Sequence, residues 1–273
     1  RLGRMKPHRL LSTLVISSLF LSTNAAADFA DGLAAYNAGD YETAFREWKP
    51  LAEQGDGSAQ FNLGVMYNNG YGVLQDYKDA VEWYTKAAEQ GIAQAQYNLG
   101  VKYDYGEGVL EDHKEAVGWY TKAAEQGIAT AQYNLGLMYD HGQGVLEDDK
   151  EAVKWYTKAA EQGIAQAQYS LGLKYHTGKG VLQGYKEAVK WYTKAAEQGD
   201  AKAQSNLAVM YESGYGVLQD DVYAHMWWNI ASSNGSENAR DNRDIVAERM
   251  TPAQLAEAQK LARECVKRDY KNC

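Results

Sequence analysis

The chain has 273 residues, 45% of them hydrophobic and 23% charged, and its 28 Lys and Arg against 36 Asp and Glu give a formal net charge of −8 at pH 7. An acidic surface repels nucleic acid and anionic lipid, so the composition argues against both and favours basic, neutral or peptide-like partners. With three prolines and abundant Ala, Leu, Glu, Gln and Lys, the chain is predicted to be helical nearly throughout.

Residues 1–27 have the pattern of a secretory signal peptide. Lys6 and Arg9 precede an apolar run over residues 10–21, and three alanines ending at Ala27 precede Asp28. A positive start, an apolar centre too short to span a bilayer and small residues at the cut define this class. We predict cleavage near Ala27 and a periplasmic or secreted mature chain without membrane insertion; the alternative is a buried N-terminal helix. The mature chain would hold 24 basic and 36 acidic residues, a net charge of −12.

A nine-residue string, WYTKAAEQG, indicates a repeat protein. It occurs four times unchanged, 36 residues apart, beginning at Trp83, Trp119, Trp155 and Trp191. Degraded copies begin at Trp48 and Trp227, and Pro50 in the first of these should kink its helix. A fixed period of this length indicates stacked units that contact only their neighbours. Such a stack offers an extended surface for holding other molecules and no obvious place for a buried reaction centre.

One unit, residues 92–127, predicts two helices joined by a Gly-x-Gly-Val-Leu loop. The first helix should end at Gly106 and Gly108, because glycine adopts the positive φ that a helix exit needs. The second should begin at Asp112 as N-cap, with Glu115 as its capping partner.

Two fixed columns are expected to carry the stack. Glycine in mid-helix costs about 1 kcal/mol against alanine. It nevertheless recurs at one position of the first helix, as Gly64, Gly100, Gly136 and Gly172, and becomes Ala208. We interpret this column as a contact with another helix backbone. The Trp column is interpreted as filling the seam between units.

The residues match a known family. The pattern Ala-x-x-x-Leu-Gly-x-x-Tyr-x-x-Gly-x-Gly-Val, followed by Asp-x-x-x-Ala-x-x-Trp-Tyr-x-Lys-Ala-Ala-x-x-Gly, resembles the Sel1-like repeat, a relative of the tetratricopeptide repeat. The likeness covers residues 56–235, and residues 28–55 look like a tetratricopeptide-like helix pair. The resemblance implies an all-α, right-handed α-solenoid of about seven helix pairs. Residues 236–273 are interpreted as a degenerate last repeat and a capping helix that opens at Thr251 and Pro252.

Columns that differ between copies are free for solvent or for partners. By resemblance to tetratricopeptide arrays, the first helix of each unit lines the concave face. Acidic side chains with tyrosines there would suit an extended basic or neutral peptide, and the alternative is drift at solvated positions. The candidate binding residues are Gln94, Gln166, Tyr97, Tyr133, Tyr169, Asp104, Asp140, His176 and Glu212.

An asparagine column is a further candidate. Asn62, Asn98, Asn134 and Asn206 precede the Leu-Gly pair, and Ser170 is the one break. An amide offers a donor and an acceptor, so a ladder of amides could grip a peptide backbone of any sequence. The alternative is structural, because Asn also ties helices to loops.

Motifs for chemistry are lacking. The chain has no S-x-x-K, S-D-N or K-T-G motif, and no histidine pair has the H-E-x-x-H spacing of a metal site, so we predict neither cofactor nor metal. Relatives described as β-lactamases or penicillin binders carry a cysteine pair in each repeat, and these repeats hold none. We therefore predict a non-catalytic binding scaffold of the cell envelope; the alternatives are a cell-wall-directed enzyme and a structural spacer.

Cys265 and Cys273 are the chain's two cysteines. Eight residues of continuous helix would hold them about 12 Å apart, too far for a disulfide. Pairing therefore requires the tail to unwind or bend back, and both alternatives stay open. The sequence also leaves the oligomeric state open.

Overall fold

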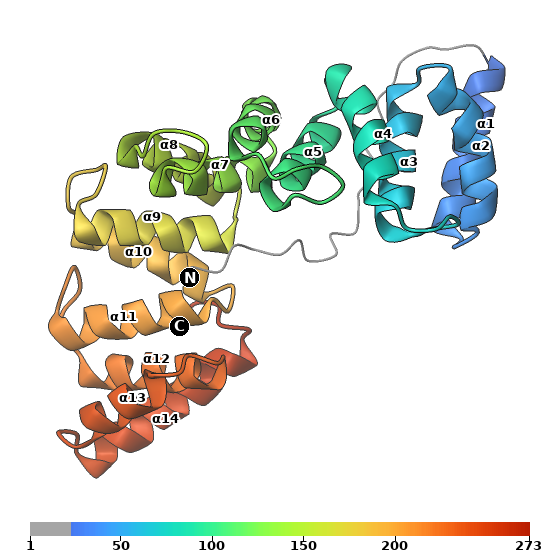
Figure 1. Ribbon diagram of the computed structural model, residues 1–273. Helices are drawn as coiled ribbons and strands as arrows, with labels where there is room; N and C mark the ends of the chain where they lie inside the picture. The colour runs from blue at the N-terminus through green and yellow to red at the C-terminus, as the bar shows by residue number, and fades with distance from the viewer. Residues whose placement is uncertain (1–22) are drawn as a thin grey trace. The chain divides into compact units, whose positions relative to one another are not determined.

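The computed structural model describes residues 23–273, with side chains from Phe29 onward. The signal-peptide prediction therefore lies largely outside the described residues and stays a prediction. The described residues form 14 helices and no strand, which confirms the all-α prediction (Figure 1). The chain divides into two compact units at Ile92, and each is described by itself.

The first unit holds two helix pairs. Its helices are α1 (Thr23–Asn37), α2 (Tyr41–Glu53), α3 (Gly57–Asn69) and α4 (Tyr77–Glu89). Pro50 lies inside α2, and the predicted kink there stays a prediction. The second unit continues the same alternation and adds the C-terminal helices. Its helices are α5 (Ala93–Tyr105), α6 (His113–Glu125), α7 (Ala129–His141), α8 (Asp149–Glu161), α9 (Ala165–Thr177), α10 (Tyr185–Ala196), α11 (Ala201–Ser213), α12 (Asp221–Ser233), α13 (Ala239–Ala247) and α14 (Pro252–Lys267).

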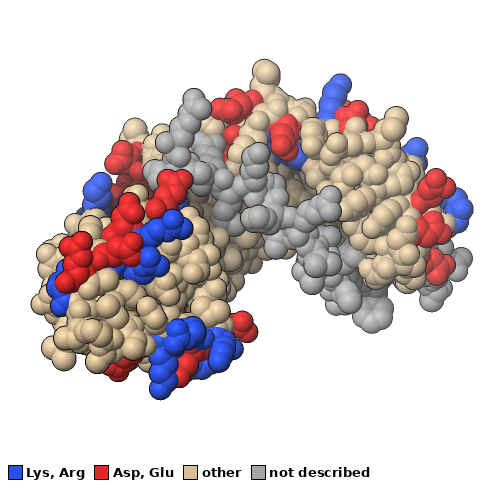
Figure 2. All heavy atoms as spheres, turned by 90° about the horizontal axis from the view of Figure 1, so that it is seen from below, with Lys and Arg blue, Asp and Glu red and all other residues tan. Residues whose placement is uncertain are grey.

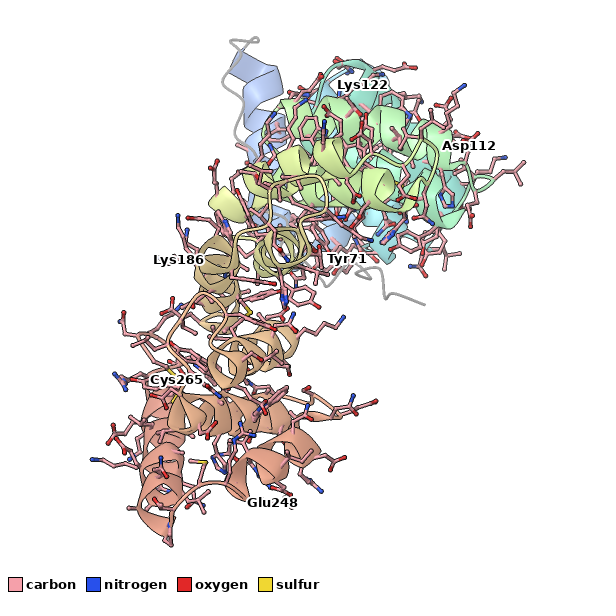
Figure 3. The ribbon with its side chains drawn as sticks, turned by 90° about the vertical axis from the view of Figure 1, so that its left-hand side faces the viewer. Tyr71, Asp112, Lys122, Lys186, Glu248 and Cys265 are labelled. Atoms are coloured by element: carbon pink, nitrogen blue, oxygen red, sulfur yellow. A yellow bond between two sulfur atoms is a disulfide. The ribbon has the colours of Figure 1, made fainter. Side chains whose placement is uncertain are left out.

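The helix ends follow the predicted chemistry. Gly106 and Gly108 have φ of 66° and 78°, in the left-handed region that favours glycine. Asp112 accepts hydrogen bonds from the backbone N–H groups of Lys114 and Glu115 at 2.9 and 3.0 Å, which confirms it as the N-cap of α6 (Figure 3). These caps fix where the loop between the two helices of a unit begins and ends.

The mid-helix glycine column contacts a tyrosine ring, so the predicted contact with a helix backbone is wrong. A Cβ on Gly136 would lie 2.6 Å from Cδ1 of Tyr156, and Gly100 stands in the same relation to Tyr120. The second glycine of the loop makes the backbone contact instead, at Gly72, Gly144, Gly180 and Gly216. A Cβ on Gly144 would collide with the carbonyl oxygen of His113, at the start of the preceding second helix. The mid-helix glycine therefore makes room for a ring inside one repeat, and the loop glycine connects successive repeats.

Tyrosine, rather than the tryptophan beside it, is the most deeply buried aromatic residue of the repeated string. The fully buried residues of this column are Tyr84, Tyr120, Tyr156 and Tyr192. In the tryptophan column, Trp155 is buried and Trp119 half-buried, and the Nζ of Lys122 lies 3.8 Å from the Trp119 ring centroid. Trp155 still packs on a core cluster drawn from α5, α6 and α7, so the seam interpretation is confirmed for it.

Buried glutamines latch one repeat to the next. Gln132 is 5% exposed, and its amide donates to the carbonyl of Ala124 at 3.0 Å. Its amide oxygen accepts from Gln162 at 2.7 Å. Gln168 repeats both contacts one repeat later, with Ala160 and Gln198. A ladder of amides that bind backbone therefore exists, but its bonds are internal to the stack.

The C-terminus closes the array differently from a regular repeat, because α12 packs against both α13 and α14. Thr251 and Gln254 form the capping box that opens α14. Helix α14 ends at Lys267, and Asp269 and Tyr270 take positive φ, so the tail turns back. This bend joins Cys273 to the buried Cys265 in a disulfide (Figure 3).

Loss of the disulfide should free the tail while the array stays folded. Without it, residues 268–273 are held by the hydrogen bonds of Tyr270 to Asn234 and of Asn272 to Glu197, each 3.0 Å long. Closing so short a loop contributes at most about 2–3 kcal/mol. We expect Cys273→Ser to make the tail sensitive to trypsin, with little change in far-ultraviolet circular dichroism. Equal cleavage of the oxidised wild-type chain would contradict this account.

Candidate functional site

The candidate residues lie on the first helix of each unit, at α3, α5, α7, α9 and α11. Most keep partial solvent access: Gln94, Tyr97, Asn98, Asn134, Asp140, Gln166, Tyr169, His176, Asn206 and Glu212 are half-buried. Asn62, Asp104 and Tyr133 are buried, with 4%, 3% and 8% of their surface exposed. The expectation that changing columns are free for partners is therefore wrong for Asp104.

The column of Asp104, Asp140, His176 and Glu212 serves the fold. Each member lies within hydrogen-bonding distance of the buried aromatic residue 16 positions later, from the second helix of the same unit. The pairs are Tyr120 Oη to Asp104 at 3.4 Å, Tyr156 Oη to Asp140 at 3.1 Å, Tyr192 Oη to the His176 Nδ1 at 3.5 Å, and Trp228 Nε1 to Glu212 at 3.4 Å. The residue type changes along this column, but each of the four side chains can accept a hydrogen bond. The column therefore connects the two helices of one repeat.

Burial also affects the protonation of the tyrosines in these pairs. It raises the pKa of Tyr120 well above its ordinary value, and the Asp104 charge adds to the rise. The hydroxyl therefore stays protonated and can donate. Asp140 also pairs with the Lys174 ammonium, which reaches Asp149 as well. Those contacts from α9 to α7 and α8 join consecutive repeats.

Asn134 and Asn206 of the asparagine column interact with tyrosines of the preceding repeat. Burial raises the pKa of Tyr97, and hydrogen bonding from Thr130 and Asn134 opposes the rise. Asn206 acts in the same way on Tyr169 and Tyr192. These contacts support the structural alternative for Asn134 and Asn206.

Ser170, the break in the asparagine series, keeps this role. Burial raises the pKa of Tyr133 to about 12, and the nearby Ser170 hydroxyl opposes the rise. A hydroxyl can therefore replace the amide at this seam. Asn62, in the first unit, has a buried Nδ2 without a hydrogen-bond partner.

Fewer residues remain accessible to a partner than the sequence predicted. It consists of the glutamines Gln94 and Gln166, with half-buried Tyr97 and Tyr169 beside them, on α5 and α9. Leu173 of α9 adds an apolar side chain that is 39% exposed. We call these five residues, with Asn98, the first-helix surface. Its amides, phenol rings and apolar surface suit an extended peptide better than a charged ligand.

A row of exposed leucines was missed by the sequence reasoning. Leu74 is 91% exposed, and Leu110, Leu146, Leu182 and Leu218 are each 90% exposed. They occupy the same position of every Gly-x-Gly-Val-Leu loop, and we call the four of the second unit the leucine row. Their invariance gives no sign of this exposure. Their position in a loop, just before the N-cap of a helix, was the signal that they face solvent.

The charge of the surface is intermixed. Figure 2 shows Lys and Arg side chains next to Asp and Glu side chains on the face that it presents. Opposite charges also pair directly: Arg249 forms ion pairs with Glu212 and Asp221 at 3.1 and 2.8 Å. The negative net charge is therefore not gathered there into one acidic patch.

Residues 23–273 contain no cluster of three or more His, Cys, Asp or Glu that could hold a metal ion. No helix in this range is long and apolar enough to cross a membrane.

The stacked helix pairs and their internal latches define a helical repeat protein. A family model for the Sel1 repeat matches five successive segments, residues 57–92, 93–128, 129–164, 165–200 and 201–236. The chain therefore belongs to the Sel1 repeat family. Proteins of this family are generally protein-interaction scaffolds, mostly non-catalytic. A comparison with curated protein sequences finds no match.

Two solved structures are similar over most of this chain. One is c5321, a protective antigen of uropathogenic Escherichia coli strains with an SLR fold, at 38% identity and a TM-score of 0.78, covering 88% of this chain and 53% of that one. The chain thus spans about half of that protein's length. The other is a Sel1 repeat protein of Oxalobacter formigenes, at 34% identity and a TM-score of 0.75, covering 86% of this chain and 99% of the other.

Proposed function

We propose that this protein is a non-catalytic scaffold of the bacterial cell envelope that holds an extended, basic or neutral protein segment against the first-helix surface. The observation that carries the proposal is the partial exposure of Gln94, Gln166 and Tyr169, whereas the invariant tyrosines and mid-helix glycines make internal contacts. Membership of a family of interaction scaffolds supports it. The disulfide and the signal-like start support the envelope location, because disulfides persist in oxidising compartments.

The leucine row supplies a second line of contacts with the same period. A partner that follows the array would meet one exposed leucine in each repeat, and apolar contact at such points strengthens binding without fixing sequence. Basic or neutral character in the partner follows from the net charge of −8.

Site-specific photocrosslinking in the native envelope tests the proposal. A photoreactive amino acid replaces Gln166 on the first-helix surface, Leu182 in the leucine row, or Lys190 on α10, whose side chain is 58% exposed. The Lys190 position is the control, because it is exposed on a second helix. We expect a discrete crosslinked protein from position 166, a weaker one from position 182, and none from position 190.

Crosslinks to protein from position 190 alone would contradict the surface that we propose. Capture of a muropeptide in place of a protein would overturn the scaffold assignment and favour a cell-wall-directed activity.

A further inference from the structure

The last repeat departs from the others on one face of its second helix. Earlier copies carry valine with threonine four residues later, as in Val117 and Thr121, whose hydroxyl donates back to the valine carbonyl at 2.8 Å. In α12 these positions are His225 and Asn229. Two polar side chains thus replace a buried apolar one and a self-satisfied hydroxyl, at the point where α13 and α14 close the array.

His225 and Asn229 line a pocket of about 470 Å³. Three helices contribute its polar lining: His225 and Asn229 from α12, Arg243 and Asp244 from α13, and Gln259 and Arg263 from α14. Ala247 and Leu255 supply an apolar wall. The pocket is open to solvent, Gln259 and Arg263 are exposed members of its lining, and polar groups from three helices converge beside the apolar wall.

His225 is the most informative residue of this pocket. It is 4% exposed, and its buried Nδ1 has no hydrogen-bond partner. Leaving a buried polar atom unpaired costs about 1–3 kcal/mol, so His225 is a group that the fold itself does not satisfy, unlike the valine of the other copies. Burial and the nearby Arg243 lower the pKa of His225, so the ring is neutral at pH 7, and a neutral imidazole can donate one hydrogen bond.

The charge of the pocket favours an anion. The Nε and NH2 groups of Arg243 bind Asp244 at 2.9 and 2.7 Å, and its NH1 binds Asn229 at 3.2 Å. Arg263 has no ion-pair partner among residues 23–273. The lining therefore holds two cations against one anion, in a chain whose net charge is −8.

We propose that this pocket binds the carboxylate of a small organic acid or of a peptide C-terminus. Arg263 supplies the unpaired cation, and its planar guanidinium matches a carboxylate. The amides of Asn229 and Gln259 and the ring of His225 supply further polar contacts. Ala247 and Leu255 receive an apolar group attached to the carboxylate. The pocket is separate from the first-helix surface, so this proposal does not depend on the proposed scaffold function.

Isothermal titration and histidine-selective NMR of the full chain test this assignment with N-acetyl-leucine as probe. N-acetyl-leucinamide is the uncharged control ligand, and inorganic phosphate is the alternative anion. We expect N-acetyl-leucine to bind and to shift the His225 ring signals, with no response to the amide or to phosphate. A tripeptide ending in leucine that binds more tightly than N-acetyl-leucine identifies a peptide C-terminus as the source; weaker binding identifies a free small acid.

Three variants complete the test. Arg263→Gln should weaken binding of N-acetyl-leucine by about tenfold or more. Arg240→Gln removes the same charge from an exposed position of α13 outside the lining and should leave binding unchanged. His225→Val restores the residue of the other copies, so it should fold at least as stably and lose the binding. Equal binding of acid and amide, a response to phosphate alone, or equal effects of Arg263→Gln and Arg240→Gln would overturn the proposal.

Discussion

Replacement of Tyr120 by alanine is expected to lower the free energy of unfolding by about 3–5 kcal/mol. The ring is fully buried, lies against Gly100, and has its centroid 6.0 Å from that of Tyr97. Alanine would leave a cavity between the helices of one repeat and would remove a donor from the buried Asp104 carboxylate. Urea denaturation followed by circular dichroism measures the loss.

The neighbouring Trp119→Ala provides the matched control. Trp119 belongs to the same invariant string, but it is half-buried and rests partly against Lys122. Its removal takes less surface out of a closed interior, so we expect a loss of about 1–2 kcal/mol. A loss from Trp119→Ala equal to or larger than that from Tyr120→Ala would contradict the assignment of tyrosine as the main aromatic of the core.

Gly136→Ala is expected to destabilise the array by about 1–3 kcal/mol, although alanine is the better helix former. The added Cβ would lie 2.6 Å from Cδ1 of the buried Tyr156 ring, far inside van der Waals contact. Tyr156 donates to Asp140 and packs against Tyr133, so the ring cannot move without losing both contacts. The same denaturation experiment measures the change.

Gly118→Ala is the control for helix propensity. Gly118 lies inside α6, is exposed, and a Cβ there would meet nothing within 4 Å. We expect this variant to stabilise the chain by about 0.5–1 kcal/mol. The two substitutions should therefore shift the unfolding midpoint in opposite directions, and shifts of the same sign would refute the close packing of Gly136 on Tyr156.

The helix pairs and their ends could be predicted because their causes are local. Asp112 caps a helix through the next few backbone N–H groups, and Gly106 takes a φ that other residues avoid. The partner of Gly100 could not be predicted, since it depends on how two helices cross. Trp119 and Tyr120 are equally invariant neighbours, and their relative burial depends on the tilt of α6 in the stack.

The candidate site shows why comparison of the copies reveals function only in part. Asp104 varies and is buried, because Asp, His and Glu can each lie within hydrogen-bonding distance of an aromatic donor from the second helix. Leu182 is invariant and 90% exposed, so burial does not explain its invariance. Gln94 and Gln166 lie near the start of a helix and away from the glycine column, and both are half-buried; their role in binding stays a prediction.

Hydrogen–deuterium exchange of the chain, alone and with the protein captured at position 166, tests the central claim most directly. If the first-helix surface holds the partner, binding should slow exchange in α5 and α9 and leave α6, α8 and α10 unchanged. Slower exchange confined to those second helices, with α5 and α9 unaffected, would contradict the claim.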